Sequence, residues 1–220
     1  MEIRERFLGD LEQIQSEVVE LTRFVKKSIG RGFEILAEGD TSGVQEISEE
    51  VKKIRVMKRG IDSTCITLIA REQPVAHDLR MIMTTIEIVS HIERIGDHAL
   101  HLAEAAGKIR PGIVGQTLPY MKKMAGIGLE MLEDSISVFT SGEHKDLRGL
   151  IHRDKEIDSL NIDLYNKIVE LMENEEDSIK EGTELMFLNR FMERLGDHAV
   201  QVCDWISFAN TGKRITSCEE

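Results

Sequence analysis

A seven-residue segment occurs twice in this chain, and no other feature of the sequence restricts the fold as strongly. Residues 93–99 read E-R-I-G-D-H-A and residues 193–199 read E-R-L-G-D-H-A, so six of the seven positions are identical at an offset of 100. Upstream, Gly39-Asp40 aligns with Gly142-Glu143 at an offset of 103. Self-similarity in the same order along a chain indicates two copies of one structural unit. We therefore predict a first unit at 1–108, a linker at 109–117, a second unit at 118–212 and a tail at 213–220.

Hydrophobic residues follow helical spacing in both copies. Leu21, Phe24, Val25 and Ile29, for example, stand at positions i, i+3, i+4 and i+8. An aromatic content of 5% and a total of three prolines also suit long helices better than many short strands. The expected helices are 2–38, 44–71, 75–107, 118–140, 144–173 and 178–209. The predicted fold class is all-α, with two repeated three-helix bundles built from six long helices.

Composition excludes several classes of protein. The formal net charge is −12, and because nucleic-acid binding needs a basic face, this balance argues against a nucleic-acid partner. The three cysteines have no C-x-x-C spacing, which argues against disulfides and against a cysteine zinc site. The N-terminus has no signal-peptide pattern, and no stretch has the 18 or so apolar residues that membrane insertion requires. We expect a cytoplasmic protein.

The repeated segment places two carboxylates one helical turn apart in each copy. Glu93 and Asp97 form the first pair, and Glu193 and Asp197 form the second. Like charges at i and i+4 destabilise a helix by about 0.2–0.5 kcal/mol, so a compensating partner is expected. The glycine before each aspartate costs about 1 kcal/mol in a helix interior, which indicates that a bulky group or another backbone approaches closely there. We therefore expect both pairs at helix–helix contacts.

A further acidic pair in the second copy faces the first across a predicted hairpin. Asp154 and Asp158 are four residues apart, and a hairpin centred at 175.5 sets Asp158 opposite Glu193 and Asp154 opposite Asp197. Four carboxylates gathered in one place must be protonated, paired with basic side chains, or bridged by a cation. Nearby arginines would supply ion pairs, whereas oxygen ligands on facing helices would hold Fe, Mn, Mg or Zn. The residues alone leave both interpretations open.

The chain also resembles the PhoU family over nearly its whole length. The resemblance rests on both copies of E-R-[IL]-G-D-H-A and on residues 71–80, which read R-E-Q-P-V-A-H-D-L-R. It implies a pair of three-helix bundles and a cytosolic, non-enzymatic accessory protein that exerts negative regulation on phosphate transport and on the phosphate-starvation response. The implied partners are the ATPase subunit of the phosphate ABC transporter and a membrane sensor histidine kinase. The implied assembly is a homodimer.

The resemblance extends to metal binding, because some family members carry multinuclear iron or zinc clusters on paired E(D)-x-x-x-D motifs. It implies iron or zinc ahead of manganese or magnesium. The implied ligands are Asp154, Asp158, Glu193, Asp197, Glu93 and Asp97. The first copy departs from the pattern, because Val51 and Arg55 align with the two aspartates at the start of the second-copy hairpin. Since Arg55 could neutralise Glu93 or Asp97 by a salt bridge, we hypothesise a metal in copy two and an ion-paired contact in copy one.

Two other functions remain open from the sequence. A carboxylate-bridged dimetal enzyme of the ferritin-like class would use E-x-x-H spacing, which the chain lacks. A metal-free helical adaptor would use the acidic pairs only as ion-paired contacts. His98 and His198 follow the repeated aspartates, and we expect them in the core or at a partner contact rather than as ligands. The basic residues around Lys52, Lys53 and Lys58 are either a solvated helix face or a surface for an acidic partner.

Overall fold

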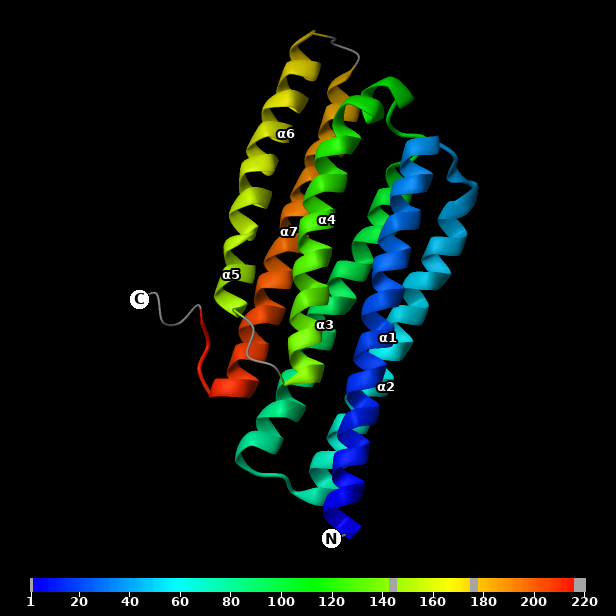
Figure 1. Ribbon diagram of the computed structural model, residues 1–220. Helices are drawn as coiled ribbons and strands as arrows, with labels where there is room; N and C mark the ends of the chain where they lie inside the picture. The colour runs from blue at the N-terminus through cyan, green and yellow to red at the C-terminus, as the bar shows by residue number, and fades with distance from the viewer. Residues whose placement is uncertain (1, 143–145, 175–177, 216–220) are drawn as a thin grey trace.

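The computed structural model describes residues 2–142, 146–174 and 178–215, and these residues form helices without any strand (Figure 1). The elements are α1 (Glu2–Glu38), the 3-10 turn η1 (Thr41–Gly43), α2 (Val44–Glu72), α3 (Ala76–Ala105), α4 (Pro111–Ser141), the short α5 (Leu147–His152), α6 (Asp154–Asn174) and α7 (Ile179–Thr211). The prediction of an all-α fold with six long helices is confirmed.

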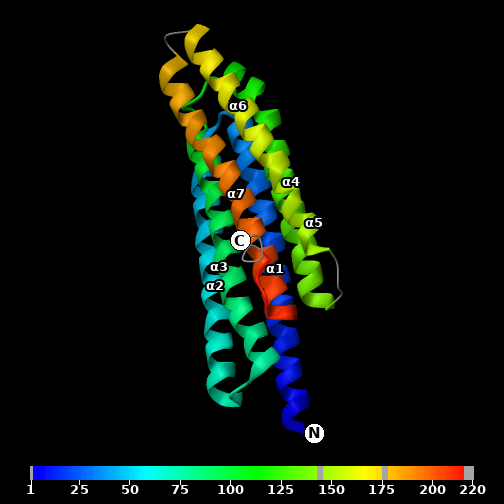
Figure 2. The same cartoon turned by 90° about the vertical axis from the view of Figure 1, so that its left-hand side faces the viewer.

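The long helices form two three-helix bundles that lie side by side. Helices α1, α2 and α3 pack against one another in the first bundle, and α4, α6 and α7 do so in the second (Figures 1 and 2). The bundles meet through α3 on α7 and, on the opposite side, through α1 on α4. The two helices that carry the repeated segment therefore contact each other at the centre of the molecule.

Buried aliphatic side chains hold each bundle together. The predicted stripe on α1 is confirmed, because Leu21, Val25 and Ile29 are at most 1% exposed. Each such side chain contributes about 1.5–3 kcal/mol by leaving water. Close packing also depends on Gly32, where a Cβ would lie 2.7 Å from the main-chain oxygen of Ala99 on α3. Helices α1 and α3 therefore approach each other more closely than a larger residue would allow.

Two predicted helix boundaries are wrong. Helix α4 begins at Pro111 rather than at 118, so residues 111–117 are helical. Pro111 suits the first turn, where its missing N–H needs no partner, and Ile113, Val114 and Thr117 anchor the extra turns in the core. Pro119 is exposed, so the carbonyl oxygen left without a donor one turn earlier can bond to water. The division of the chain into two domains stays a prediction.

The predicted helix at 144–173 is instead two helices. The chain makes a tight turn between α5 and α6, where the Arg153 main-chain N–H donates to the carbonyl of Leu150 at 3.0 Å. Its predicted start at 144 and the predicted hairpin centre near 175 lie outside the described residues. Over the described ranges, no helix has the combination of length and apolar character that crossing a membrane requires.

Candidate functional site

The acidic residues of the second copy lie where α6 packs on α7. Asp154 is the first residue of α6, and its carboxylate lies directly over Gly196 of α7. A Cβ at Gly196 would come within 2.5 Å of Asp154 Oδ1 and within 2.8 Å of Ile157 Cδ1. The expectation that this glycine permits a close approach is therefore confirmed. The group that approaches is itself one of the predicted site carboxylates.

The four second-copy carboxylates lie close enough to influence one another's ionisation. Burial raises the pKa of Asp154 to about 6, and Asp158, Asp197 and Glu193 reinforce the shift. Burial also raises the pKa of Asp197; two nearby arginines oppose the shift and Asp158 adds to it. The structure thus brings together the residues that the hairpin register placed opposite each other.

Arginines neutralise only part of this charge. Arg190 bonds to the carboxylate of Glu193 one turn away on α7. Arg153 instead reaches α4, where its guanidinium lies 2.5 Å from Glu130 and 3.4 Å from Asp134. Among the described residues, no group of three or more His, Cys, Asp or Glu is drawn together as a coordination shell. The four carboxylates nevertheless offer only oxygen donors and carry more negative charge than the nearby arginines neutralise. Such a donor set is chemically suited to a hard or borderline cation.

The first copy has a different arrangement at the corresponding helix contact. Arg55 of α2 donates through Nη2 to Asp97 Oδ1 at 2.8 Å, so the predicted salt bridge is confirmed. Val51 is buried at the position that matches Asp154. A Cβ at Gly96 would lie 2.8 Å from Ile54 Cδ1, so this glycine also permits a close approach, here by an aliphatic side chain. The chemistry of this contact suits an ion pair on an apolar base.

Histidines and one phenylalanine join α3 to α7. His98 is 6% exposed and stacks on Phe191 with ring centroids 5.3 Å apart. His198 lies against His91, with the two Nδ1 atoms 3.2 Å apart. Because the offset of 100 matches His98 with His198 and His91 with Phe191, the two ring pairs are equivalent by the repeat. The expectation that His98 lies in the core is confirmed. Sequence reasoning missed His91 and Phe191, because the offset matches these two positions without showing that α3 contacts α7.

Burial keeps these histidines neutral near pH 7. It lowers the pKa of His98 to about 3, with nearby His101, His198 and Arg194 adding to the shift. It lowers the pKa of His91 and of His198 to about 4. Both ring nitrogens of His98 lack a hydrogen-bond partner among the described residues. These rings therefore act as packing between the bundles.

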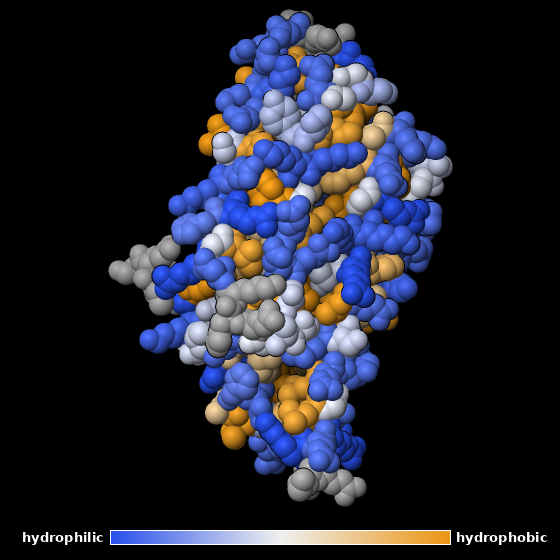
Figure 3. Space-filling view, in the orientation of Figure 1, coloured by the Kyte–Doolittle hydropathy of each residue, from blue (hydrophilic) through white to orange (hydrophobic). Residues whose placement is uncertain are grey.

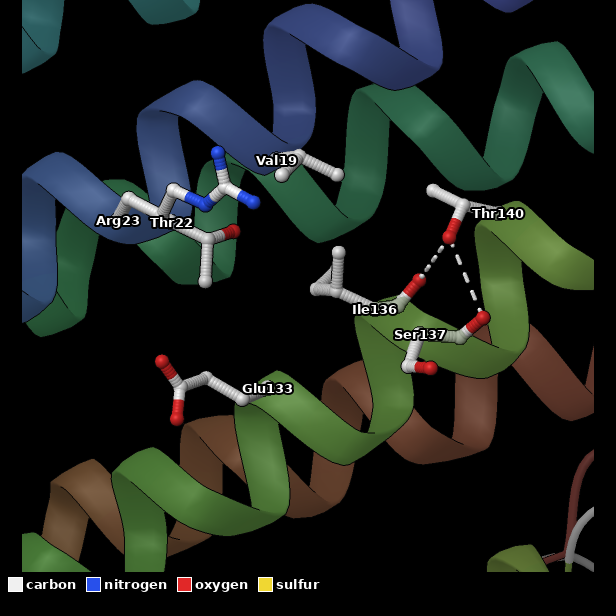
Figure 4. A pocket seen from close by; sticks show the side chains of 7 residues that line it. All are labelled: Val19, Thr22, Arg23, Glu133, Ile136, Ser137 and Thr140. Atoms are coloured by element: carbon white, nitrogen blue, oxygen red, sulfur yellow. Dashed lines mark hydrogen bonds between the residues drawn. The ribbon is translucent and has the colours of Figure 1, made fainter.

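A cavity of about 290 Å³ lies between α1 and α4 on the face shown in Figure 3, where apolar surface is visible between hydrophilic side chains. Arg23 and Glu133 face the cavity from opposite helices (Figure 4). Glu133 pairs with Lys26 at 2.8 Å, and the hydroxyls of Thr22 and Thr140 donate to main-chain carbonyls of their own helices. No nucleophile with a hydrogen-bonded base is found among the described residues that line it.

The basic residues of α2 are largely engaged within the molecule. Lys52 pairs with Glu49 at 2.7 Å and Lys58 with Asp62 at 2.7 Å. Lys53 lies 4.7 Å from the centroid of the Phe24 ring, in a cation–π contact. These contacts favour the interpretation of this segment as an ordinary helix surface.

Comparison with known proteins connects this geometry to one family. The family model described as PhoU domain matches twice, at residues 18–106 and 121–206. A Clostridium acetobutylicum protein named phosphate-specific transport system accessory protein PhoU homolog is 29% identical over 96% of this chain and 97% of its own length. A Methanothermobacter thermautotrophicus protein, the PhoU homolog 1 of the same description, is 31% identical over 93% of this chain and 94% of its own length.

Two crystal structures share the fold. The structure of PhoU from Pseudomonas aeruginosa matches with a TM-score of 0.83 at 23% identity, over 94% of this chain and all of the other. The phosphate transport system regulatory protein PhoU from Streptococcus pneumoniae matches with a TM-score of 0.84 at 24% identity, over 95% of this chain and 99% of the other. At these identities the likeness establishes the arrangement of helices.

Proposed function

This chain belongs to the PhoU family, and from that premise we propose that it is an accessory protein that regulates inorganic phosphate uptake and the phosphate-starvation response. The observation that carries the proposal is the double match to the family model, one in each copy of the repeat. Relatives that cover nearly the whole chain bear the name of accessory proteins of the phosphate-specific transport system. The proposed effect is negative: the protein restrains uptake when phosphate is plentiful.

The protein acts in this proposal by contact with other proteins rather than by catalysis. Its partners are the ATPase subunit of the phosphate ABC transporter and a membrane sensor histidine kinase, both of which are reached from the cytoplasm. The net charge of −12 argues against nucleic acid as a further partner. A homodimer is part of the same proposal.

Binding of the transporter tests this directly. The purified chain is passed over the immobilised ATPase subunit of the phosphate transporter from the same genome, and the ATPase subunit of another ABC importer from that genome serves as the control. We expect retention on the first and not on the second. Equal retention on both, or on neither, would refute the proposed contact.

We further propose that copy two binds a metal ion through Asp154, Asp158, Glu193 and Asp197, with iron or zinc preferred over manganese or magnesium. The raised pKa of Asp154, caused by burial and by the other three carboxylates, supports the proposal. A bound cation would offset both the loss of hydration and the repulsion between the carboxylates. A bound cation would neutralise these carboxylates and link α6 to α7. In copy one, Glu93 and Asp97 remain candidate ligands by family resemblance alone, because Arg55 already neutralises Asp97.

Elemental analysis of the untagged protein and of a Glu193→Ala/Asp197→Ala variant tests the metal proposal. Metal in the parent that is lost in the variant supports the copy-two site. Metal retained by this variant and lost from Glu93→Ala/Asp97→Ala would place it in copy one instead. If the protein holds no metal after exposure to iron and zinc, it acts as a metal-free helical adaptor. The same result would rule out the carboxylate-bridged dimetal enzyme as an alternative function.

A further inference from the structure

A cavity of about 230 Å³, here called the α3–α7 cavity, opens between the C-terminal part of α3 and the N-terminal part of α7. Its walls combine aromatic rings with carboxylates. His101 stacks on Phe191 with ring centroids 4.3 Å apart, and Phe187 is 58% exposed. Glu104 and Glu184 contribute negative charge, and Lys108, which also lines the cavity, pairs with Glu184. Aromatic faces beside carboxylates are an environment that suits a cationic side chain.

The internal repeat relates this cavity to a position in the second copy that is filled. At the offset of 100, His101 corresponds to Gln201 and Glu104 to Asp204. Arg214 fills this site in the second copy: its Nη2 donates to Gln201 Oε1 at 3.0 Å and its Nε donates to the Asp204 carboxylate. The positions equivalent to His101 and Glu104 therefore already hold a guanidinium in the second copy.

Arg214 reaches its position because the chain turns back after α7. The turn occurs at Gly212, whose φ of 77° favours glycine. The main-chain N–H of Ile215 then donates to the buried Asp204 carboxylate at 2.5 Å. The Arg214 guanidinium lies 4.0 Å from the centroid of the Trp205 ring. A carboxylate, a neutral side-chain oxygen and an aromatic face thus contact the guanidinium. Trp205 corresponds to Ala105 in the first copy, so in the α3–α7 cavity the aromatic face comes from His101 and Phe191 instead.

The chain that follows α3 takes another course and leaves the α3–α7 cavity without such an arginine. Helix α3 ends at Ala105, five residues before Arg110. Arg110 pairs with Glu181 at 2.8 Å and does not line the cavity. Lys108 pairs with Glu184 at 3.4 Å. Glu104 has no Lys or Arg within ion-pair distance among the described residues, and the nearest ring nitrogen, that of His101, is 4.0 Å away.

We propose that the α3–α7 cavity binds an arginine side chain presented by a partner protein, with Glu104 in the role that the equivalent Asp204 has toward Arg214. Glu104 accepts hydrogen bonds from the guanidinium, and the stacked rings of His101 and Phe191 supply the flat face beneath it. The exposed ring of Phe187 covers the neighbouring apolar part of the partner. The proposal concerns the chain itself and does not depend on the proposed role in phosphate regulation.

Nuclear magnetic resonance of the full chain tests this with N-acetyl-arginine methylamide as the probe. We expect the ring resonances of Phe187, Phe191 and His101 to shift in a saturable manner, with a half-point on the order of millimolar for a single side chain. The citrulline analogue keeps the shape of the probe but carries no charge, and it should produce no saturable shift. The lysine analogue should bind more weakly because it lacks the planar fork.

Variants locate the binding. Glu104→Gln should raise the half-point at least about fivefold, and this side chain is 50% exposed, so the variant should fold normally. Glu170→Gln, at an exposed carboxylate of α6, is the matched control and should leave the half-point unchanged. Three results would overturn the proposal: no saturable shift of these rings, equal shifts with citrulline, or a half-point that Glu104→Gln leaves unaltered. Equal binding of the lysine analogue would overturn the assignment to arginine.

Discussion

Replacing Asp154 by asparagine should stabilise the metal-free protein at neutral pH, although it alters a partly buried residue at a helix contact. The folded chain raises the pKa of Asp154 from the ordinary 3.8 to about 6 through burial and through Asp158, Asp197 and Glu193. The folded state therefore binds this proton more tightly than the unfolded state does. The stabilising contribution of the protonated form is complete below about pH 4 and is lost as the pH rises through about 6.

The magnitude follows from that gap. About two pH units at 1.36 kcal/mol each give an upper bound of about 3 kcal/mol. Partial solvation of the carboxylate screens the effect. An acidic residue in the first turn of α6 also gains about 0.3–1 kcal/mol from the helix dipole, and asparagine loses this gain. We therefore expect Asp154→Asn to be more stable than the parent by about 1 kcal/mol at pH 7.5, and not more stable at pH 4.

Urea unfolding followed by circular dichroism, with a chelator present, measures this difference. Asp163→Asn, at an exposed carboxylate on the same helix, is the control and should change stability by less than about 0.5 kcal/mol. The reasoning is refuted if Asp154→Asn is the less stable protein at pH 7.5 without metal. Adding iron or zinc should reverse the order, because a ligand at 100 times its Kd contributes about 2.7 kcal/mol to the protein that binds it.

Three other changes test the packing and the charges. Gly32→Ala should destabilise the protein by about 1–3 kcal/mol, because the new Cβ would lie 2.7 Å from a main-chain oxygen of α3. Gly30→Ala on the same helix is the control; its new Cβ meets nothing within 4 Å, so it should be neutral or stabilising. If thermal unfolding ranks the two variants the other way, the α1–α3 contact is contradicted. A double-mutant cycle on Arg55 and Asp97 should give a coupling energy of about 0.2–1 kcal/mol, since both side chains are about a third exposed or more. A coupling energy above about 2 kcal/mol would mean that the pair is buried. Burial lowers the pKa of His98 to about 3, so its neutral form stabilises the fold above pH 6.5 and that contribution is lost as the pH falls. His98→Phe should therefore lose less stability between pH 7 and pH 5 than the parent does. Parallel plots of stability against pH for the two proteins would contradict this.

The sequence predicted most of the helices and the closeness of the second-copy carboxylates to one another, because both depend on regular spacing. Hydrophobic periodicity located the core of α1, and hairpin symmetry placed Asp154 opposite Asp197 without knowledge of the turn between them. The repeat also identified Gly96 and Gly196 as positions of close approach. In each case a one-dimensional period fixes which side chains share a helix face.

The errors arose where local signals conflicted with tertiary contacts. The predicted start at 118 places Pro119 in the first turn, which proline favours, but Pro111 meets the same condition and buried residues after it extend α4. The break at Arg153 has no glycine or proline to mark it. The pairing of His91 with His198 requires knowledge that α3 crosses α7, which no spacing within one helix supplies. The position of Arg214 on Trp205 depends likewise on a chain reversal after the last helix.

The central claim is that this protein restrains phosphate uptake, and radiolabelled phosphate uptake in its native cells tests it most directly. Cells with the gene and cells without it are grown in low phosphate and then given excess phosphate. The account predicts that uptake falls within minutes in cells with the gene and stays high in cells without it, and that the reintroduced gene restores the fall. An equal fall in both strains would contradict the proposed function.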